Sequence, residues 1–195
     1  MAGTRGARIV TEVFAPAVLA AAMPIVVGLH AGPTWWRGLG WGLLTVFFSA
    51  VVPYAVIRVF MRLGRIEGDH HIGDRRQRRL PLLFAMLSVL LGVVALWLLG
   101  APREVVAIGA VMLAVLAGTG LVNAVWWKLS AHTAVAAGSA AVLVLLFGPV
   151  LLVTAPVVGA IAWSRVRLRD HTTAQVLAGI VLGAVLAPAV WLPLA

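Results

Sequence analysis

The feature that most constrains this chain is a succession of apolar segments with very little polar sequence between them. An α-helix needs about 20 apolar residues to cross the hydrocarbon core of a bilayer. Backbone polar groups in lipid are satisfied only within helices or closed barrels, and no segment alternates as a barrel strand would. The sequence therefore predicts an all-α integral membrane protein, a bundle of six or seven transmembrane helices. The predicted spans are Val10–Leu29, Trp41–Phe60, Leu80–Leu99, Val105–Trp126, Ala131–Gly148, Pro149–Trp163 and Thr172–Leu194.

The composition agrees with lipid as the solvent. Of the 195 residues, 63% are hydrophobic and 11% are charged, whereas a soluble domain is about half apolar and about a quarter charged. The first apolar segment exceeds the roughly 7–15 residues of a signal-peptide core, so we interpret it as a membrane span; if it lies on the membrane surface, six spans remain. With no cysteine, the chain has no disulfide framework and no thiolate site. We expect one transmembrane helical domain over residues 1–195, with a single hydrophilic loop at residues 62–79.

The basic residues are distributed unequally between the two sides of this predicted bundle. Connections rich in Lys and Arg stay in the cytoplasm, so we predict a multi-pass protein of the cell (inner or plasma) membrane whose N-terminal side is cytoplasmic. The net charge of +9 then reflects topology, and we expect a membrane and no nucleic acid as the partner, with no particular oligomeric state indicated. The N-terminal side holds Arg5, Arg8, Arg58, Arg62, Arg65, Arg75, Arg76, Arg78, Arg79, Lys128, Arg165, Arg167 and Arg169; the far side holds Arg37 and Arg103.

Most of the remaining hydrophilic side chains belong to three connections on the same side. Arg guanidinium groups match phosphate oxygens two at a time, and histidine can attack phosphorus or carry a proton near neutral pH. This set of residue types is therefore suited to handling phosphate. The first connection contains Glu67, Asp69, His70, His71, Asp74, Arg75, Arg76, Arg78 and Arg79; the second contains Lys128, Ser130 and His132; the third contains Ser164, Arg165, Arg167, Arg169, Asp170, His171 and Gln175.

The spacing of these residues resembles a known family. Ser164-Arg165, five residues and then His171 is similar to the third motif, SR-x5-H-x3-D, of the type 2 phosphatidic acid phosphatase superfamily. Lys128-Leu-Ser130-Ala-His132 is similar to its second motif, PSGH, and Arg79-Leu-Pro81 loosely resembles the end of its first motif, K-x6-RP. The order of the motifs and their shared side of the membrane agree with a divergent bacterial branch of this family.

The resemblance implies a role for each matching residue. His171 would be the nucleophile that forms a phospho-histidine, and His132 would protonate the leaving oxygen. Arg165, Ser130 and the basic residues of the first connection would hold the phosphoryl oxygens. The family has Asp where this chain has Gln175, whose carbonyl oxygen can still accept a hydrogen bond from the imidazole but adds no charge. The alternatives for orienting the ring are Asp69, Asp74 and Asp170. The phosphate-binding candidates are Arg165, Ser130, Lys128, Arg75, Arg78, Arg79 and Ser164, and the catalytic candidates are His171, His132, Gln175 and Asp69.

The expected activity is hydrolysis of a lipid phosphate or diphosphate, with the active site facing the cytoplasm and no cofactor. The substrate candidates are polyprenyl phosphates or diphosphates, phosphatidic acid, phosphatidylglycerol phosphate and a lipid-linked sugar phosphate. The lipid tail would lie between helices, among which a GxxxG at Gly179 and Gly183 predicts close packing. A similar stripe of small residues, Ala136, Ser139 and Ala140, follows His132.

Two other functions fit the same residues. A metal-dependent prenyl or phospholipid transferase would use Asp69, His70 and Asp74 as ligands, with Mg²⁺ favouring the carboxylates, although paired DxxxD or DDxxD motifs are absent. A protein that binds a lipid headgroup without turning it over would account for Gln175. Transport is disfavoured because no charged residue lies deep within a span.

Overall fold

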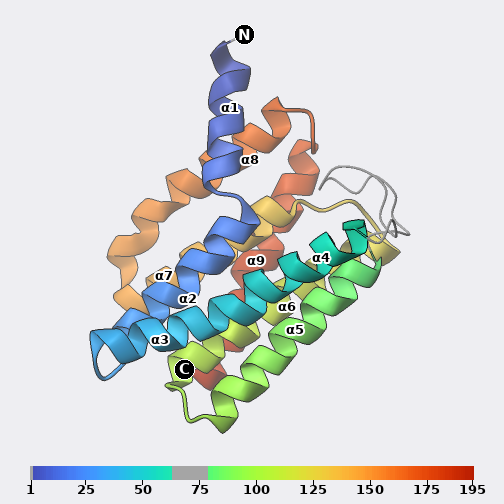
Figure 1. Ribbon diagram of the computed structural model, residues 1–195. Coiled ribbons are helices and arrows are strands. Elements are labelled where there is room, and N and C mark those ends of the chain that lie inside the picture. Colours follow the sequence, from blue (N-terminus) through green and yellow to red (C-terminus); the bar gives the residue numbers. More distant parts are fainter. Residues whose placement is uncertain (1, 63–78) are drawn as a thin grey trace.

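The computed structural model describes residues 2–62 and 79–195, and these form an all-α membrane bundle without strands (Figure 1). Side chains are described from Thr4 to Arg62 and from Pro81 onward. The predicted fold class is confirmed. In chain order the helices are α1 (Ala2–Val13), α2 (Pro16–Ala31), α3 (Trp35–Val46), the π-helical turn η1 (Phe47–Val51), α4 (Val52–Arg62), α5 (Arg79–Leu98), α6 (Arg103–Val125), α7 (Ala131–Phe147), the 3₁₀ turn η2 (Pro149–Thr154), α8 (Ala155–Arg167) and α9 (Thr173–Leu194).

The first predicted span, Val10–Leu29, is wrong as one straight helix. The chain bends by 41° between α1 and α2. Proline disfavours helical dihedrals in the residue before it, and Ala15, which precedes Pro16, has an extended ψ of 146°. Pro16 then begins α2 at the position where its missing N–H costs nothing. As a result α1 leaves the bundle and packs along α8.

A single long helical span, Trp35–Arg62, follows α2 and contains a π-helical turn near its middle. Such turns often accompany functional positions. The hydroxyl of Ser88 on α5 donates to the backbone oxygen of Phe48, within this turn, at 2.6 Å. The hydrogen bond joins α5 to the middle of this span.

Five helical spans are long and apolar enough to cross a membrane, and the bent α1–α2 pair makes a sixth if it is counted as one span. The remaining apolar helix, α7, has 17 residues. Its length is about 25 Å at 1.5 Å per residue, a little less than the roughly 30 Å hydrocarbon core. Within the described ranges the helices therefore support a multi-pass membrane protein.

The closest helix packing joins α7 and α9 through two glycines. A Cβ atom on Gly183 would overlap the backbone oxygen of Ala134, and one on Gly179 would lie 2.6 Å from the oxygen of Ser130. The close approach predicted from the GxxxG is thus confirmed. The small residues noted after His132 lie outside this contact: the side of α7 that meets α9 carries Ser130, Ala134 and Gly138, while Ala136 and Ala140 pack in a cluster with Val158 and Ile161 of α8.

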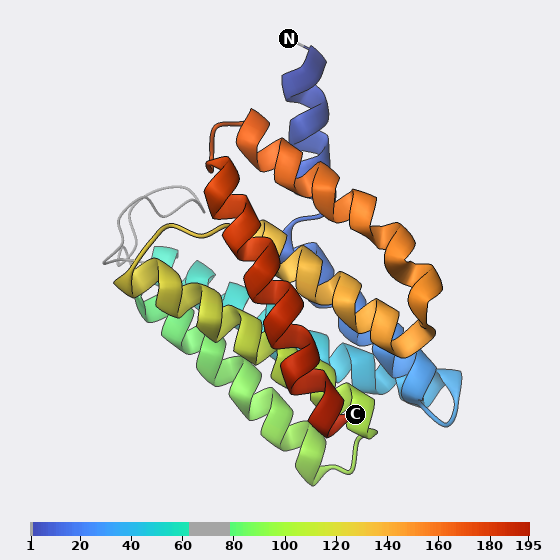
Figure 2. The same cartoon turned by 180° about the vertical axis from the view of Figure 1, so that it is seen from behind.

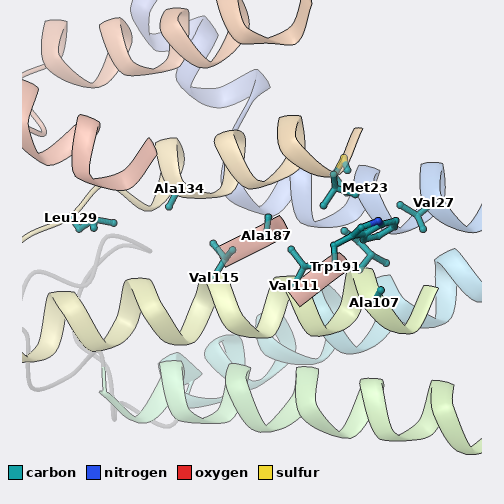
Figure 3. Close-up of a cluster of buried hydrophobic side chains, with 11 residues drawn as sticks. Met23, Val27, Ala107, Val111, Val115, Leu129, Ala134, Ala187 and Trp191 are labelled. Carbon is teal, nitrogen blue, oxygen red and sulfur yellow. The ribbon is translucent and has the colours of Figure 1, made fainter. Parts of the chain in front are cut away.

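The core lies between α2, α6, α7 and α9 (Figure 3). Met23 and Val27 of α2, Val111 and Val115 of α6 and Trp191 of α9 are buried in one cluster. Seen from behind, α9 crosses the bundle beside α6 and α7, and the α6–α7 and α8–α9 connections lie at the same end (Figure 2). Both of these connections carry polar residues of the predicted site.

Candidate functional site

The connection between α8 and α9 is a compact turn that places His171 above the end of α8. The N–H groups of Asp170 and His171 both donate to the oxygen of Arg165, at 3.1 and 3.3 Å, and the N–H of Arg169 donates to Val166 at 3.0 Å. This is the Schellman pattern of helix ends, in which the residue after the cap is left-handed and usually glycine. Here that residue is Arg169, with φ of 61°. The turn therefore holds some backbone strain at the position that directs His171.

The first turn of α9 fixes the imidazole of His171. Thr172 caps the helix by accepting from the N–H of Gln175 at 3.3 Å, and the side-chain oxygen of Gln175 accepts from the N–H of Thr172 at 3.1 Å. The same Gln175 oxygen lies 3.2 Å from Nδ1 of His171. An amide oxygen only accepts, so Nδ1 carries the hydrogen. In the neutral ring Nε2 is then the atom with a free electron pair.

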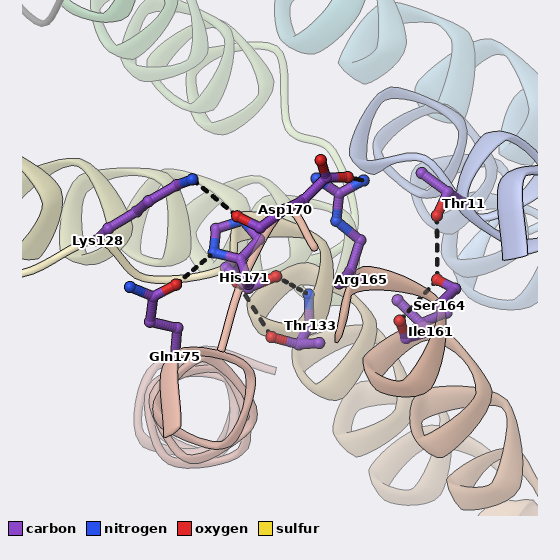
Figure 4. Close-up of polar contacts among 10 residues, drawn as sticks. Thr11, Lys128, Thr133, Ile161, Ser164, Arg165, Asp170, His171 and Gln175 are labelled. Carbon is purple, nitrogen blue, oxygen red and sulfur yellow. Dashed lines mark hydrogen bonds and ion pairs between the residues drawn. The ribbon is translucent and has the colours of Figure 1, made fainter. Parts of the chain in front are cut away.

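Two cationic side chains flank this histidine (Figure 4). Lys128, from the α6–α7 connection, donates through Nζ to the backbone oxygen of Asp170 at 2.7 Å. Arg165 pairs with the carboxylate of Asp170 at 3.0 Å. The Arg165 side chain is only 13% exposed, and its buried Nε–H has no partner among the described residues. A buried donor without an acceptor is costly, so Arg165 has hydrogen-bonding capacity left for an anion.

The environment keeps His171 neutral. Burial lowers the pKa of His171 below 6.5, and the positive charges of Lys128 and Arg165 lower it further. The hydrogen bond to Gln175 and the carboxylate of Asp170 act in the opposite direction but are weaker. At neutral pH the ring is therefore uncharged, with Nε2 available as a nucleophile or base.

Asn123, near the end of α6, holds the segment that carries Lys128. Its side-chain oxygen accepts from the N–H of Leu129 at 2.7 Å, and its amide donates to the oxygens of Leu129 and Thr119 at 3.3 and 2.8 Å. Asn123 is not among the residues of the predicted site. Its position, one turn before a polar connection, was the available signal for this supporting role.

The two serines of the predicted site are buried and engaged within the fold. The hydroxyl of Ser164 donates to the oxygen of Ile161 at 2.7 Å and accepts from Thr11 of α1 at 3.0 Å. It therefore faces α1 and is not brought together with His171. Ser130 is fully buried and caps α7, where its hydroxyl accepts from the N–H of Thr133 at 3.5 Å.

The starts of α7 and α9 are hydrogen-bonded to each other. The backbone N–H of Ser130 donates to the backbone oxygen of Gln175 at 3.3 Å, and the hydroxyl of Thr133 donates to the backbone oxygen of Val176 at 3.0 Å. The N-termini of α7 and α9, which favour anions, thus lie next to Lys128 and Arg165. His132 is the second residue of α7 and half-buried, and its role as a proton donor stays a prediction.

The structure describes only part of the first polar connection. Asp69, His70, Asp74, Arg75 and Arg78 lie outside the described residues, and so does the side chain of Arg79, whose backbone begins α5. The assembled site therefore consists of Arg165, His171 and Gln175 with Lys128 and Asp170. Among the residues that the structure describes, no group of three or more His, Cys, Asp or Glu side chains is arranged to hold a metal ion.

Comparison of the chain with protein-family models, curated proteins and solved structures found no match. A proposed function consequently rests on the geometry of this site and on the motifs in the sequence.

Proposed function

We propose that this protein is a membrane-embedded phosphohydrolase that acts on a lipid phosphate or diphosphate through a phospho-histidine at His171. The observation that carries the proposal is a neutral imidazole with Nδ1–H held by Gln175, between Lys128 and Arg165. This arrangement joins a nucleophile to two cations that suit phosphoryl oxygens.

The chemistry follows from these groups. Nε2 attacks phosphorus, and the P–O bond to the lipid breaks while an Nε2–P bond forms. The lipid oxygen takes a proton, which we assign to His132. Water then attacks the phosphorus and gives a proton to His132, which restores its protonated form. The Nε2–P bond breaks, its electron pair returns to Nε2, and phosphate is released. Arg165 and Lys128 stabilise the charge that develops on the phosphoryl oxygens.

The carboxylate of Asp170 competes with the substrate for Arg165. It pairs with Arg165 at 3.0 Å, so a phosphate that binds Arg165 must displace or share this carboxylate. A phosphate monoester carries up to two negative charges and three acceptor oxygens. It can therefore accept more hydrogen bonds from the guanidinium group, and offer it more negative charge, than one carboxylate does.

The direct test is phosphate release by purified protein in detergent. The substrates are polyprenyl diphosphate, phosphatidic acid and phosphatidylglycerol phosphate, each with and without EDTA. We expect release that resists EDTA and is lost in His171→Ala, and a large loss in Arg165→Ala but not in Arg167→Ala, which removes an exposed arginine from the same helix.

The intermediate gives a second readout. A ³²P-labelled substrate is expected to leave an acid-labile, base-stable phosphoryl group on the wild-type chain and none on His171→Ala. Release that requires Mg²⁺ and survives His171→Ala would refute the histidine mechanism and favour the metal-dependent transferase. Binding of anionic vesicles without any release would favour the headgroup-binding alternative.

We also propose that the site faces the cytoplasm, as the distribution of basic residues favours. The chain has no cysteine, so single-cysteine variants report topology directly. Arg167→Cys is expected to resist a membrane-impermeant maleimide in intact cells, and Arg37→Cys to react. The reverse pattern would overturn the orientation without affecting the proposed chemistry.

A further inference from the structure

An apolar cavity of about 250 Å³ lies inside the bundle, away from the His171 ring. Side chains from α2, α5, α6 and α7 line it together with η1, and they include Met23, Val89, Val111 and Val135. Ala17 also lines it and is exposed, so the cavity reaches the protein surface beside the α1–α2 bend. Pockets for drug-sized ligands enclose about 300–1,000 Å³, so this cavity is suited to one hydrocarbon chain and not to a whole lipid.

Two residues that line this cavity carry buried hydroxyl groups without a hydrogen-bond partner in the described part of the chain. Thr119 of α6 is only 7% exposed, and neither its Oγ1 nor the buried Oγ of Ser49 in η1 has a partner among the described residues. An unpaired hydroxyl in apolar surroundings is costly. A ligand that brings a hydrogen-bond acceptor into the cavity would remove this cost.

Hydrogen bonds and helix geometry fix how far Thr119 lies from Lys128 along α6, toward the middle of the bundle. The backbone oxygen of Thr119 accepts from Asn123, and Asn123 in turn holds the backbone of Leu129. Thr119 therefore lies about 6 Å, four residues of α6, below Asn123, which is bonded to the residue after Lys128. In an ester-linked glycerolipid, the ester carbonyls likewise lie one step below the phosphate, where the acyl chains begin.

We propose that this cavity binds one acyl chain of an ester-linked membrane lipid, with the hydroxyl of Thr119 donating to the ester carbonyl oxygen. The chain then occupies the space between α2, α5, α6 and α7. The inference rests on the proposed function only for the position of the lipid phosphate near Lys128. A polyprenyl phosphate has no carbonyl at this depth, so the proposal favours glycerolipid phosphates among the candidate substrates.

The test is photolabelling in vesicles of a diether phosphatidylcholine, which lacks the ester carbonyl. The probe is a non-hydrolysable phosphonate analogue of phosphatidic acid with a diazirine in one acyl chain, and labelled peptides are mapped by mass spectrometry. Wild-type protein is expected to be labelled on the cavity-lining parts of α2, α6 and α7. Ala85→Phe, which fills the cavity from α5, is expected to lose at least four-fifths of this label. Ala55→Phe, on the exposed side of α4, is the matched control and is expected to retain it.

The ester contact is tested by competition between unlabelled diester and diether analogues. Wild-type protein is expected to prefer the ester about fivefold, the ratio that one hydrogen bond of about 1 kcal/mol gives. Thr119→Val is expected to abolish this preference, and Thr45→Val, whose hydroxyl bonds within its own helix, is expected to keep it.

Each result separates the inference from the proposed activity. Label spread over the outer surface and unchanged in Ala85→Phe would overturn the acyl-chain site. Equal competition by ester and ether in the wild type would overturn the contact with Thr119. Neither measurement needs turnover, so cavity labelling without phosphate release would refute the proposed hydrolysis and leave the lipid site standing.

Discussion

Replacing Gln175 by glutamate is expected to make His171 bind its proton more tightly. The two side chains have nearly the same shape, and Glu at this position also completes a capping box, so α9 keeps its cap. The change adds a full negative charge where the amide oxygen now lies 3.2 Å from Nδ1. The imidazolium form is then stabilised by a charge that the wild-type site lacks.

The size of this effect follows from the separation of the charges. Two unit charges at 4 Å interact by about 1 kcal/mol in water and by about 4 kcal/mol at an effective dielectric constant of 20. His171 is only half-buried, so solvent screening favours the lower part of this range, about 1–2 kcal/mol. Gln175→Met, which removes the hydrogen bond and adds no charge, is expected to lower the pKa of His171 further.

The assay is a pH titration of ¹⁵N-histidine-labelled protein in detergent micelles, with the His171 signals assigned from the His171→Ala spectrum. In the wild type, burial and the neighbouring cations hold the pKa of His171 below 6.5, so its Nε2 signal is expected to stay that of a neutral ring down to mildly acidic pH. The midpoint is expected to rise in Gln175→Glu and fall in Gln175→Met. Identical midpoints in all three proteins would refute the contact between the imidazole and residue 175 and the mechanism built on it.

Three further predictions concern stability and support of the site, each measured as thermal unfolding in detergent. Gly183→Ala is expected to destabilise by about 1–3 kcal/mol, because its Cβ would overlap the backbone of α7, whereas Gly159→Ala meets no atom within 4 Å and is expected to stabilise slightly; equal effects would contradict the packing. Arg169→Gly is expected to stabilise by about 1 kcal/mol by relieving a positive φ, while Arg167→Gly, at the last residue of α8, is expected to destabilise slightly. Asn123→Leu is expected to cost about 2 kcal/mol, for two lost hydrogen bonds to the α6–α7 connection, and to raise KM more than it lowers kcat; an unchanged KM would contradict its positioning role.

The helices were predictable because apolar length alone decides whether a segment can cross a bilayer. The bend before Pro16 was also present in the sequence, since the residue before proline avoids helical dihedrals, but continuous hydropathy obscured it. The π-helical turn at Phe47–Val51 was not predicted from the sequence. The hydroxyl of Ser88, a residue 40 positions away, donates to the oxygen of Phe48 within it.

The structure brings together only some residues of the predicted site, and the reason is geometrical. Adjacent residues on an α-helix point about 100° apart, and here Ser164 and Arg165 turn to different neighbours. Arg165 joins His171, and Ser164 faces α1. The contact of Gln175 with the imidazole could be predicted because both belong to a single helix start, where four-residue spacing fixes the geometry. The face of α7 that packs against α9 could not, because it depends on how two distant helices are aligned.

The neutral amide at position 175 and the lowered pKa of His171 are parts of the same electrostatic arrangement. A carboxylate there would hold the ring nearer to its charged form and, after attack, would stabilise the positive phospho-imidazolium. The amide keeps the hydrogen on Nδ1 and, with Lys128 and Arg165 nearby, leaves Nε2 unprotonated before attack. In the proposed mechanism, the amide therefore increases the fraction of uncharged imidazole before attack. The positive phospho-imidazolium then lacks the stabilisation that a carboxylate would give it. The proposed mechanism consequently requires the cations to lower the energy of the phosphoryl group by more than they raise that of the ring.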